Sequence, residues 1–181
     1  SQPYYSVGEN WDGNSDNLKN WINATYSGGA NISGAFDFAL YYTLSSAVKN
    51  NNYNSFNTSA MPGLAGQYGF SEKAVTFIDN HDTFAHDSDY FSGNNIMKGY
   101  AYILTHPGIP CVWAPHYYGG TYSKDGKTRV YANNSKAINA IMAARKASGV
   151  DAYSHVVVDQ SGFGIYGAYI KKRYEDAEPV L

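Results

Sequence analysis

Two periods of hydrophobic and polar residues alternate along most of this chain. Short apolar runs rich in β-branched and aromatic residues are each followed by a segment with apolar residues at i, i+3 and i+4, the spacing of one buried helix face. The predicted strands are 4–8, 34–38, 74–78 and 109–113, and the predicted helices are 16–22, 38–49, 96–105 and 135–148. Strands separated by helices pair in parallel through crossover connections. The pattern therefore predicts an α/β fold with a parallel sheet.

The pattern changes after Gly149. Residues 155–158 and 164–170 alternate with a period of two around Asp-Gln-Ser-Gly at 159–162, which predicts a β-hairpin that turns at those four residues. We therefore divide the chain into 1–150 and 151–181. A complete eight-unit barrel needs about 250 residues. The four strand–helix units are thus either a small open sheet or half of such a barrel.

Polar residues follow the central strand abruptly. Residues 74–78 are apolar or β-branched, and Asp79, Asn80, His81 and Asp82 come next. In parallel α/β proteins, chemistry is carried at the carboxyl ends of the strands. Taken singly, Asp79 and Asn80 favour hydrogen bonds to the local backbone. His81 and Asp82 can face one cavity only if the backbone turns there, because neighbours in an extended segment point to opposite sides.

Acidic residues also follow two other predicted strands. Glu9, Asp37 and Asp82 would converge on one pocket if their strands are neighbours. Cleavage of a glycosidic bond needs one carboxylic acid to protonate the leaving oxygen and another carboxylate to attack or support the oxocarbenium-like centre. The three acids therefore suggest glycoside chemistry.

Composition and charge narrow the classes of molecule that this chain could bind. A net charge of −2 and a pI near 6.2 give no basic surface for nucleic acid or acidic membranes, and no apolar run approaches the roughly 18 residues of a membrane span. Cys111 is the single cysteine, so an intrachain disulfide and a thiolate metal site are excluded. The 18 Tyr and 3 Trp residues suit sugar surfaces, although tyrosine also fills ordinary cores.

Three segments resemble a known family. Val-Gly-Glu-Asn-Trp at 7–11 resembles the segment that bears the general acid in the α-amylase family, glycoside hydrolase family thirteen, and Phe-Ile-Asp-Asn-His-Asp-Thr at 77–83 resembles its last signature segment. Residues 99–110 are similar to plant-type and related bacterial α-amylases. The resemblance extends to about Gly149. It implies the second half of a (β/α)8 TIM-type barrel, followed by the first strands of a C-terminal β-sandwich domain.

The resemblance implies a role for individual residues. Glu9 would be the general acid/base and Asp82 the transition-state stabiliser, with His81 donating to the same sugar ring. Trp11 and Tyr117 would contact substrate by stacking on sugars, although each is as well explained by packing. Asp37 is not one of the family's three catalytic acids, and we interpret it as structural.

The chain also departs from the family pattern. The nucleophilic Asp, the Arg that orients it and the calcium-binding excursion belong to earlier family segments that this sequence does not contain. We therefore expect part of a retaining endo-hydrolase of α-1,4-glucans that is inactive alone. Its partners would be an α-glucan or maltooligosaccharide and the missing N-terminal barrel half. We expect no cofactor in this chain, calcium in the whole enzyme, and secretion, although no segment resembles a signal peptide.

Two other functions stay open. The chain could be a non-catalytic glucan-binding or assembly piece that uses the same cleft. It could also be a metal-dependent phosphohydrolase whose ligands are His81, Asp82, His86, Asp87 and Asp89. The latter fits less well, because His-Asp metal sites usually lie on helices and His81 follows a strand.

Overall fold

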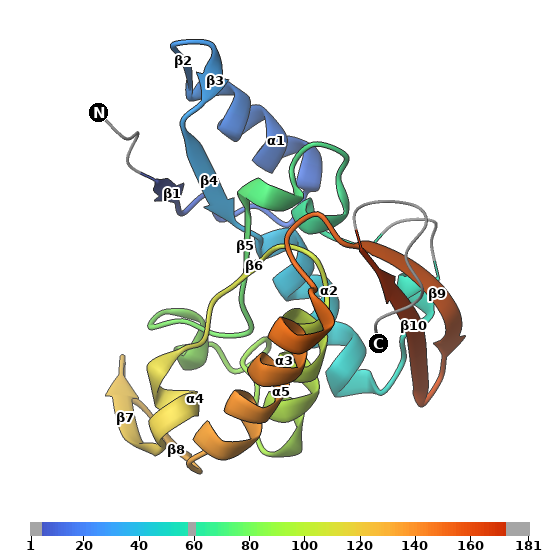
Figure 1. Ribbon diagram of the computed structural model, residues 1–181. Helices are drawn as coiled ribbons and strands as arrows, with labels where there is room; N and C mark the ends of the chain where they lie inside the picture. Colours follow the sequence, from blue (N-terminus) through green and yellow to red (C-terminus); the bar gives the residue numbers. More distant parts are fainter. Residues whose placement is uncertain (1–4, 58–60, 173–181) are drawn as a thin grey trace.

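A parallel sheet organises the computed structural model, which describes residues 5–57 and 61–172. The strand order is β1-β4-β5-β6, and each neighbouring pair is parallel (Figure 1). The strands are β1 (Ser6–Gly8), β4 (Ser33–Phe36), β5 (Ala74–Thr76) and β6 (Ile109–Pro110). Three of them lie within the predicted strands, and β4 begins one residue before the predicted strand 34–38. The last is shorter than predicted, although the Cys111 N–H still donates to the Thr76 carbonyl at 2.7 Å.

Helices follow each strand, as the periodicity predicts. They are α1 (Ser15–Ala24), α2 (Phe38–Asn50), α3 (Asn94–Thr105) and α5 (Ser135–Ser148), with the short α4 (Ala114–Tyr118) between β6 and the next hairpin. Single 3-10 turns are η1 (Asn54–Phe56), η2 (Leu64–Gly66), η3 (Ser71–Lys73) and η4 (Thr83–Ala85). Among the described residues, no helix is long and apolar enough to cross a membrane.

Helix α2 contributes much of the hydrophobic core. Its Phe38, Leu40, Tyr41 and Leu44 are fully or almost fully buried. The Tyr41 ring stacks on Phe77, just after β5, with centroids 5.0 Å apart and planes 5° from parallel. This packing anchors the residues just after β5 to α2, next to the polar residues that follow Ile78.

Three antiparallel hairpins complete the part of the fold that the structure describes. They are β2 (Tyr26–Ser27) with β3 (Ala30–Asn31), β7 (Gly120–Lys124) with β8 (Lys127–Tyr131), and β9 (His155–Gly162) with β10 (Ile165–Lys171). The predicted turn at 159–162 is wrong, because β9 continues to Gly162 and the chain reverses at Phe163 and Gly164. The register shift between Gly167 and Ala168 accommodates the extra residue.

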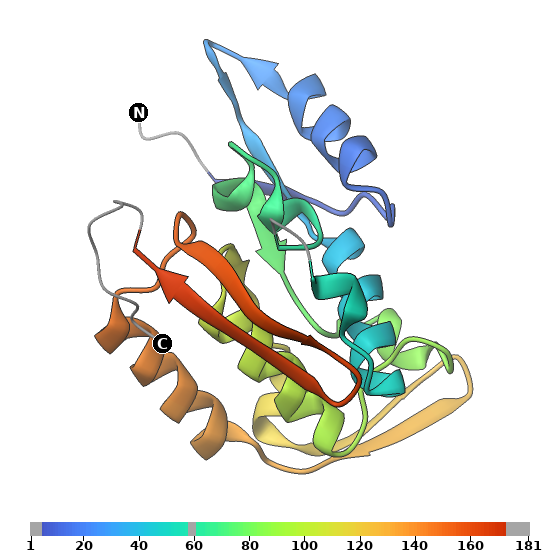
Figure 2. The same cartoon turned by 90° about the vertical axis from the view of Figure 1, so that its right-hand side faces the viewer.

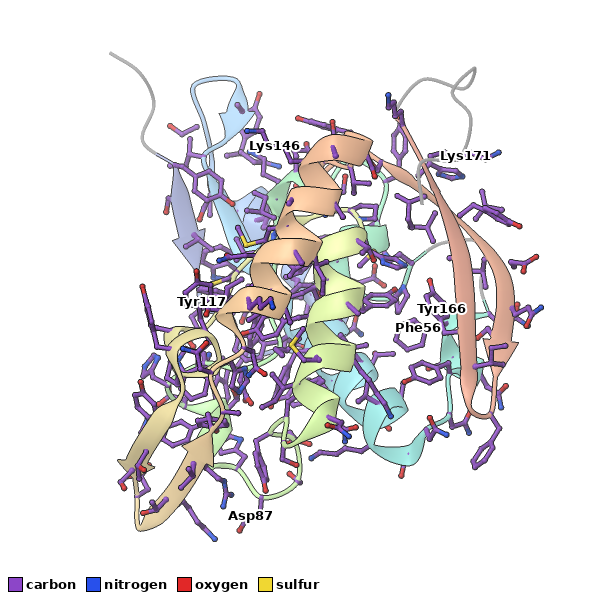
Figure 3. All side chains as sticks on the ribbon, turned by 60° about the horizontal axis from the view of Figure 1, so that its bottom comes forward. Phe56, Asp87, Tyr117, Lys146, Tyr166 and Lys171 are labelled. Carbon is purple, nitrogen blue, oxygen red and sulfur yellow. The ribbon has the colours of Figure 1, made fainter. Side chains whose placement is uncertain are left out.

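The β9–β10 hairpin packs against the helical layer (Figure 2). Tyr166 lies beside Phe56 of η1 with ring centroids 5.5 Å apart (Figure 3), and its hydroxyl is 2.9 Å from His106 Nε2. Burial lowers the pKa of His106 to about 3, so this histidine is neutral at ordinary pH. The hairpin is therefore docked through aromatic packing and a neutral hydrogen bond.

Candidate functional site

Glu9 follows β1 directly, and two side chains hold its carboxylate. Trp11 Nε1 donates to Glu9 Oε1 at 3.0 Å, and Asn80 Nδ2 lies 3.4 Å from the same oxygen. Trp11 belongs to the same loop, whereas Asn80 comes from the end of β5, two strands away in the sheet. The carboxyl ends of β1 and β5 are thus joined through Glu9.

Gly8 allows this arrangement. A Cβ atom at position 8 would lie 1.9 Å from Cη2 of the Trp21 ring, well inside contact distance. Trp21, on α1, packs over the end of β1 against the core. Any larger residue at position 8 would displace the indole or the strand end that carries Glu9.

Asn80 also builds the turn that follows β5. Its Oδ1 accepts from the N–H groups of Asp82 at 2.9 Å and Thr83 at 2.8 Å, and its own N–H donates to Thr83 Oγ1 at 2.8 Å. The backbone of Asp82 is helical, with φ −104° and ψ −50°. The chain therefore turns at Asp82, which is the condition for His81 and Asp82 to face one cavity. One Asn80 amide binds Glu9 through its nitrogen and fixes the Asp82 backbone through its oxygen.

His81 and Asp82 lie together as a result of this turn. His81 Nε2 is 3.4 Å from Asp82 Oδ2, and the two side chains are 75% and 30% exposed. The other oxygen of Asp82, Oδ1, forms an ion pair with Lys124 at the end of β7. Asp82 is thus partly shielded by two cationic or potentially cationic groups, while His81 remains open to solvent.

Asp79 supports the turn from inside. Its Oδ1 accepts from the Thr83 hydroxyl at 2.6 Å, and its Oδ2 accepts from the Phe91 N–H at 2.9 Å. His116 Nε2, from α4, lies 3.6 Å from Oδ2. Burial raises the pKa of Asp79 to about 7, although both hydrogen bonds favour its ionised form, and burial lowers the pKa of His116 to about 3. Asp79 is therefore a structural residue, as its position in a turn suggests.

The predicted convergence of three acids is wrong for Asp37. This residue caps α2 by accepting from the Leu40 N–H at 2.9 Å, and it also accepts from the N–H groups of Leu64 at 2.9 Å and Ala65 at 2.8 Å. Its side chain is fully buried, and burial raises its pKa to about 6 despite those three donors. Backbone N–H groups donate to both oxygens of the carboxylate, which confirms the structural interpretation of Asp37.

The two predicted aromatic contacts lie in different places. The Trp11 ring packs against Phe38, with centroids 5.0 Å apart, and is still 42% exposed beside Glu9. Tyr117 lies on α4 (Figure 3), where its hydroxyl hydrogen-bonds Asn139 of α5 at 2.9–3.1 Å and its ring packs edge-on against Tyr118. The structure brings Trp11 to Glu9 and leaves Tyr117 with partners outside this group.

Metal-ligand geometry does not arise among the described residues. No group of three or more His, Cys, Asp or Glu side chains in 5–57 and 61–172 could hold a metal ion. Asp87, a candidate phosphohydrolase ligand, instead pairs with Lys127 and with Arg129, whose Nη2 lies 2.7 Å from Asp87 Oδ1. The proposed His-Asp metal cluster is therefore wrong, and these residues offer no donor set for calcium.

Two residues of this group were not assigned to it from sequence. The sequence indicates only the local backbone bonds of Asn80 and not its bond to Glu9, and it does not single out Lys124. A polar residue between two candidate site residues is a signal that could have singled out Asn80. Lys124 carries no such local signal, because its proximity to Asp82 depends on how the hairpin docks.

Comparisons with known proteins agree with the residues that first suggested a family. The chain is 40% identical over 134 residues to "Probable alpha-amylase 2" of Arabidopsis thaliana, covering 65% of this chain and 31% of that protein. It is 33% identical over 190 aligned residues to "Alpha-amylase 3, chloroplastic" of the same plant, covering 96% and 19%. The resemblance to the α-amylase family is confirmed. No family model matches this amylase-like chain.

A bacterial relative extends this result. A glucan 1,4-alpha-maltotetraohydrolase of Stutzerimonas stutzeri is 32% identical over 173 residues, covering 87% of this chain and 30% of that protein. The chain spans less than a third of the length of these three relatives.

The fold is that of α-amylases. The H. orenii α-amylase structure has a TM-score of 0.66 at 16% identity, covering 97% of this chain and 42% of that one. An Anoxybacillus α-amylase also gives 0.66, at 18% identity, with coverage of 97% and 40%. The chain therefore has the fold of the second half of a (β/α)8 barrel followed by the first strands of a C-terminal β domain.

Proposed function

We propose that this chain supplies the acid/base and the transition-state stabiliser of a retaining endo-hydrolase of α-1,4-glucans, and that it is inactive alone. Glu9 is the acid/base and Asp82 the stabiliser. The observation that carries the proposal is the Asn80 side chain, which binds Glu9 at 3.4 Å and the Asp82 N–H at 2.9 Å. Two acids implied by family resemblance are thereby held at the same end of the sheet.

The proposed reaction divides between this chain and another segment. Glu9, as the acid, protonates the leaving glycosidic oxygen and then removes a proton from the water that hydrolyses the glycosyl intermediate. Asp82 accepts hydrogen bonds from hydroxyl groups of the sugar at the cleavage site. His81, largely exposed beside it, donates a hydrogen bond to the same sugar. The nucleophilic carboxylate comes from the N-terminal barrel half. Without it, the covalent intermediate cannot form.

The surroundings of Glu9 suit this role. Trp11 and Asn80 donate to one oxygen, Oε1, which fixes the orientation of the carboxyl group. In the acid form, the proton then resides on the other oxygen, Oε2, where it can be transferred. Trp11 also presents a partly exposed indole for a sugar ring. A sugar contact by Tyr117 stays a prediction.

We also propose the division 1–150 and 151–181, with the missing N-terminal barrel half as the partner of the first part. In the described sheet, β1 and β6 are the outer strands, so each has one unpaired edge. A closed barrel has no free edges. Secretion and a calcium site in the partner half belong to the same proposal, and N-terminal sequencing and metal analysis of the whole enzyme test them.

Hydrolysis of starch by three preparations tests the function. The chain alone should release no reducing sugar, and the chain complemented with the N-terminal barrel half of a relative should release it. Glu9→Gln, which keeps the size and hydrogen-bond acceptor but cannot transfer the proton, should abolish that activity. Activity that survives this substitution contradicts the role of Glu9. A complemented wild-type complex that binds maltooligosaccharide and never cleaves it supports the alternative of a non-catalytic glucan-binding piece.

A further inference from the structure

The β7–β8 hairpin is fastened to the loop that follows β5. Asp87 of that loop forms ion pairs with Lys127 and Arg129 of β8, and the Arg129 guanidinium lies 4.0 Å from the centroid of the Tyr90 ring. Each exposed ion pair contributes little by itself. The two cations share one carboxylate, however, and the arginine stacks at the same time, so the contacts act together on one strand.

This attachment places the end of β7 at Asp82. Lys124 is the last residue of β7, and its register partner is Lys127, the first residue of β8. The same two-residue turn therefore separates the lysine that pairs with Asp82 from the lysine that pairs with Asp87. Because Asp87 holds β8 through Arg129 as well as through Lys127, the ammonium of Lys124 on the other side of the turn is placed at Asp82.

The two oxygens of Asp82 have different neighbours. Lys124 Nζ pairs with Oδ1, while His81 Nε2 lies 3.4 Å from Oδ2. The Lys124 side chain is 35% exposed, so the pair is partly shielded from water. A carboxylate tethered at one oxygen by a cation has fewer orientations available, and its second oxygen remains directed toward His81.

We propose that Lys124 is a positioning residue that holds the Asp82 carboxylate through Oδ1 and leaves Oδ2, beside His81, to accept a sugar hydroxyl. This inference rests on the proposed function, in which Asp82 binds the sugar at the cleavage site. A carboxylate free to rotate would present its oxygen to the hydroxyl for only part of the time. Misplacement of a binding group by about 1 Å can reduce a rate by roughly a hundredfold.

An NMR measurement on the chain alone tests the contact without requiring activity. Protein labelled with ¹³C at aspartate side chains would be compared at pH 7, with Asp82→Asn used to assign the Asp82 Cγ signal. Lys124→Met should move that signal. Lys127→Met should leave it in place, because it removes the same charge from the same hairpin while Arg129 still pairs with Asp87. An Asp82 signal that is the same in Lys124→Met and wild type overturns the proposal.

Kinetics of the complemented enzyme on maltooligosaccharide test the positioning role. Lys124→Met should lower kcat about 10- to 100-fold with a smaller change in KM, Lys124→Arg should recover part of kcat by restoring the cation, and Lys127→Met should stay within about twofold of wild type. Equal losses in Lys124→Met and Lys127→Met would show that hairpin stability or net charge, not Asp82, is responsible. An inactive wild-type complex contradicts the proposed function instead, and the NMR result still decides whether Lys124 holds Asp82.

Discussion

Asn80 and Glu9 are 71 positions apart in the sequence, and Asn80 Nδ2 lies 3.4 Å from Glu9 Oε1. The contact crosses from the end of β5 to the end of β1, over the intervening strand β4. Because Asn80 Oδ1 also accepts from two N–H groups of its own turn, movement of that turn would move the donor that Glu9 uses. The acid and the turn that carries Asp82 are therefore mechanically linked.

Substitutions at Asn80 should separate its two tasks. Asn80→Asp keeps an oxygen for the N–H groups of Asp82 and Thr83 but replaces the donor to Glu9 with a second carboxylate oxygen. Asn80→Ala removes all of these bonds. We expect Asn80→Ala to lower the free energy of unfolding by about 1–3 kcal/mol and Asn80→Asp by less, because Asn80→Ala leaves two partly buried N–H groups without an acceptor. Urea unfolding followed by circular dichroism measures both.

In the complemented enzyme, the two variants should have the opposite order in activity, with Asn80→Asp less active than Asn80→Ala. Asn80→Asp should lose most of its activity in spite of its better stability, because a second negative group then lies beside the acid. If Asn80→Asp were as unstable as Asn80→Ala but fully active, the amide oxygen would not stabilise the turn and the nitrogen would have no role at Glu9.

Gly8→Ala should be costly even though it adds a single methyl group. The new Cβ would overlap the Trp21 ring, whose nearest atom is 1.9 Å away. Overpacking of this kind typically lowers stability by about 1–3 kcal/mol. Trp21→Leu in the same chain should relieve the overlap, so the cost of Gly8→Ala should fall in that background in a double-mutant cycle. An equal cost in both backgrounds would mean that Trp21 is not the obstacle.

The sheet and its helices could be predicted because each one has its own local hydrophobic period, and residues 38–49 match α2 almost to the residue. The turn of the β9–β10 hairpin could not be predicted from the local sequence. Asp-Gln-Ser-Gly is good turn sequence, but the Tyr53 N–H donates to the Gly162 carbonyl at 2.9 Å and the Gly164 N–H donates to the Asn51 carbonyl at 2.7 Å. These long-range bonds to the chain after α2 hold β9 extended through Gly162 and place the reversal after it.

The residues of the candidate site were likewise only partly predictable from the sequence. Glu9 and Asp82 follow strands in motifs that resemble those of a family, so the sequence suffices to name them as candidates. Asp37 follows a strand just as they do, yet its carboxylate caps a helix and does not face a cavity. This difference depends on the packing of η2 against α2, because η2 supplies two of the three N–H groups that donate to Asp37. No local pattern records that contact.

Asp37→Ala should therefore be among the most destabilising changes in the chain. It leaves the buried N–H groups of Leu40, Leu64 and Ala65 without their acceptor. Loss of a helix cap costs about 1 kcal/mol, and each further unpaired buried donor about 1–3 kcal/mol, so we expect a loss of roughly 3 kcal/mol or more. Asp16→Ala is the matched control, since it removes an exposed acid that pairs with Lys19 at 2.7 Å and should change stability by less than about 1 kcal/mol. Similar losses for the two variants would contradict the capping role.

Asp79→Asn should reveal a pH-dependent contribution to stability. Burial raises the pKa of Asp79 from 3.8 to about 7, so between pH 4 and 7 the folded chain holds a proton that the unfolded chain has released. Asp79 therefore favours folding most at low pH, and that contribution is lost as the pH rises through about 7. A shift of this size corresponds to roughly 4 kcal/mol across that interval.

The cost of Asp79→Asn, measured as the difference from wild type in urea unfolding at several pH values, should be largest near pH 4 and fall toward pH 7.5. Asp37, with a raised pKa, and His106, with a lowered one, do not contact Asp79, so they titrate in both proteins and cancel in this difference. Gly8→Ala serves as the control, because a steric overlap costs the same at every pH. A cost of Asp79→Asn that stays constant or grows with pH would show that the buried carboxyl is ionised throughout, in which case His116, 3.6 Å away, would have to carry the compensating positive charge.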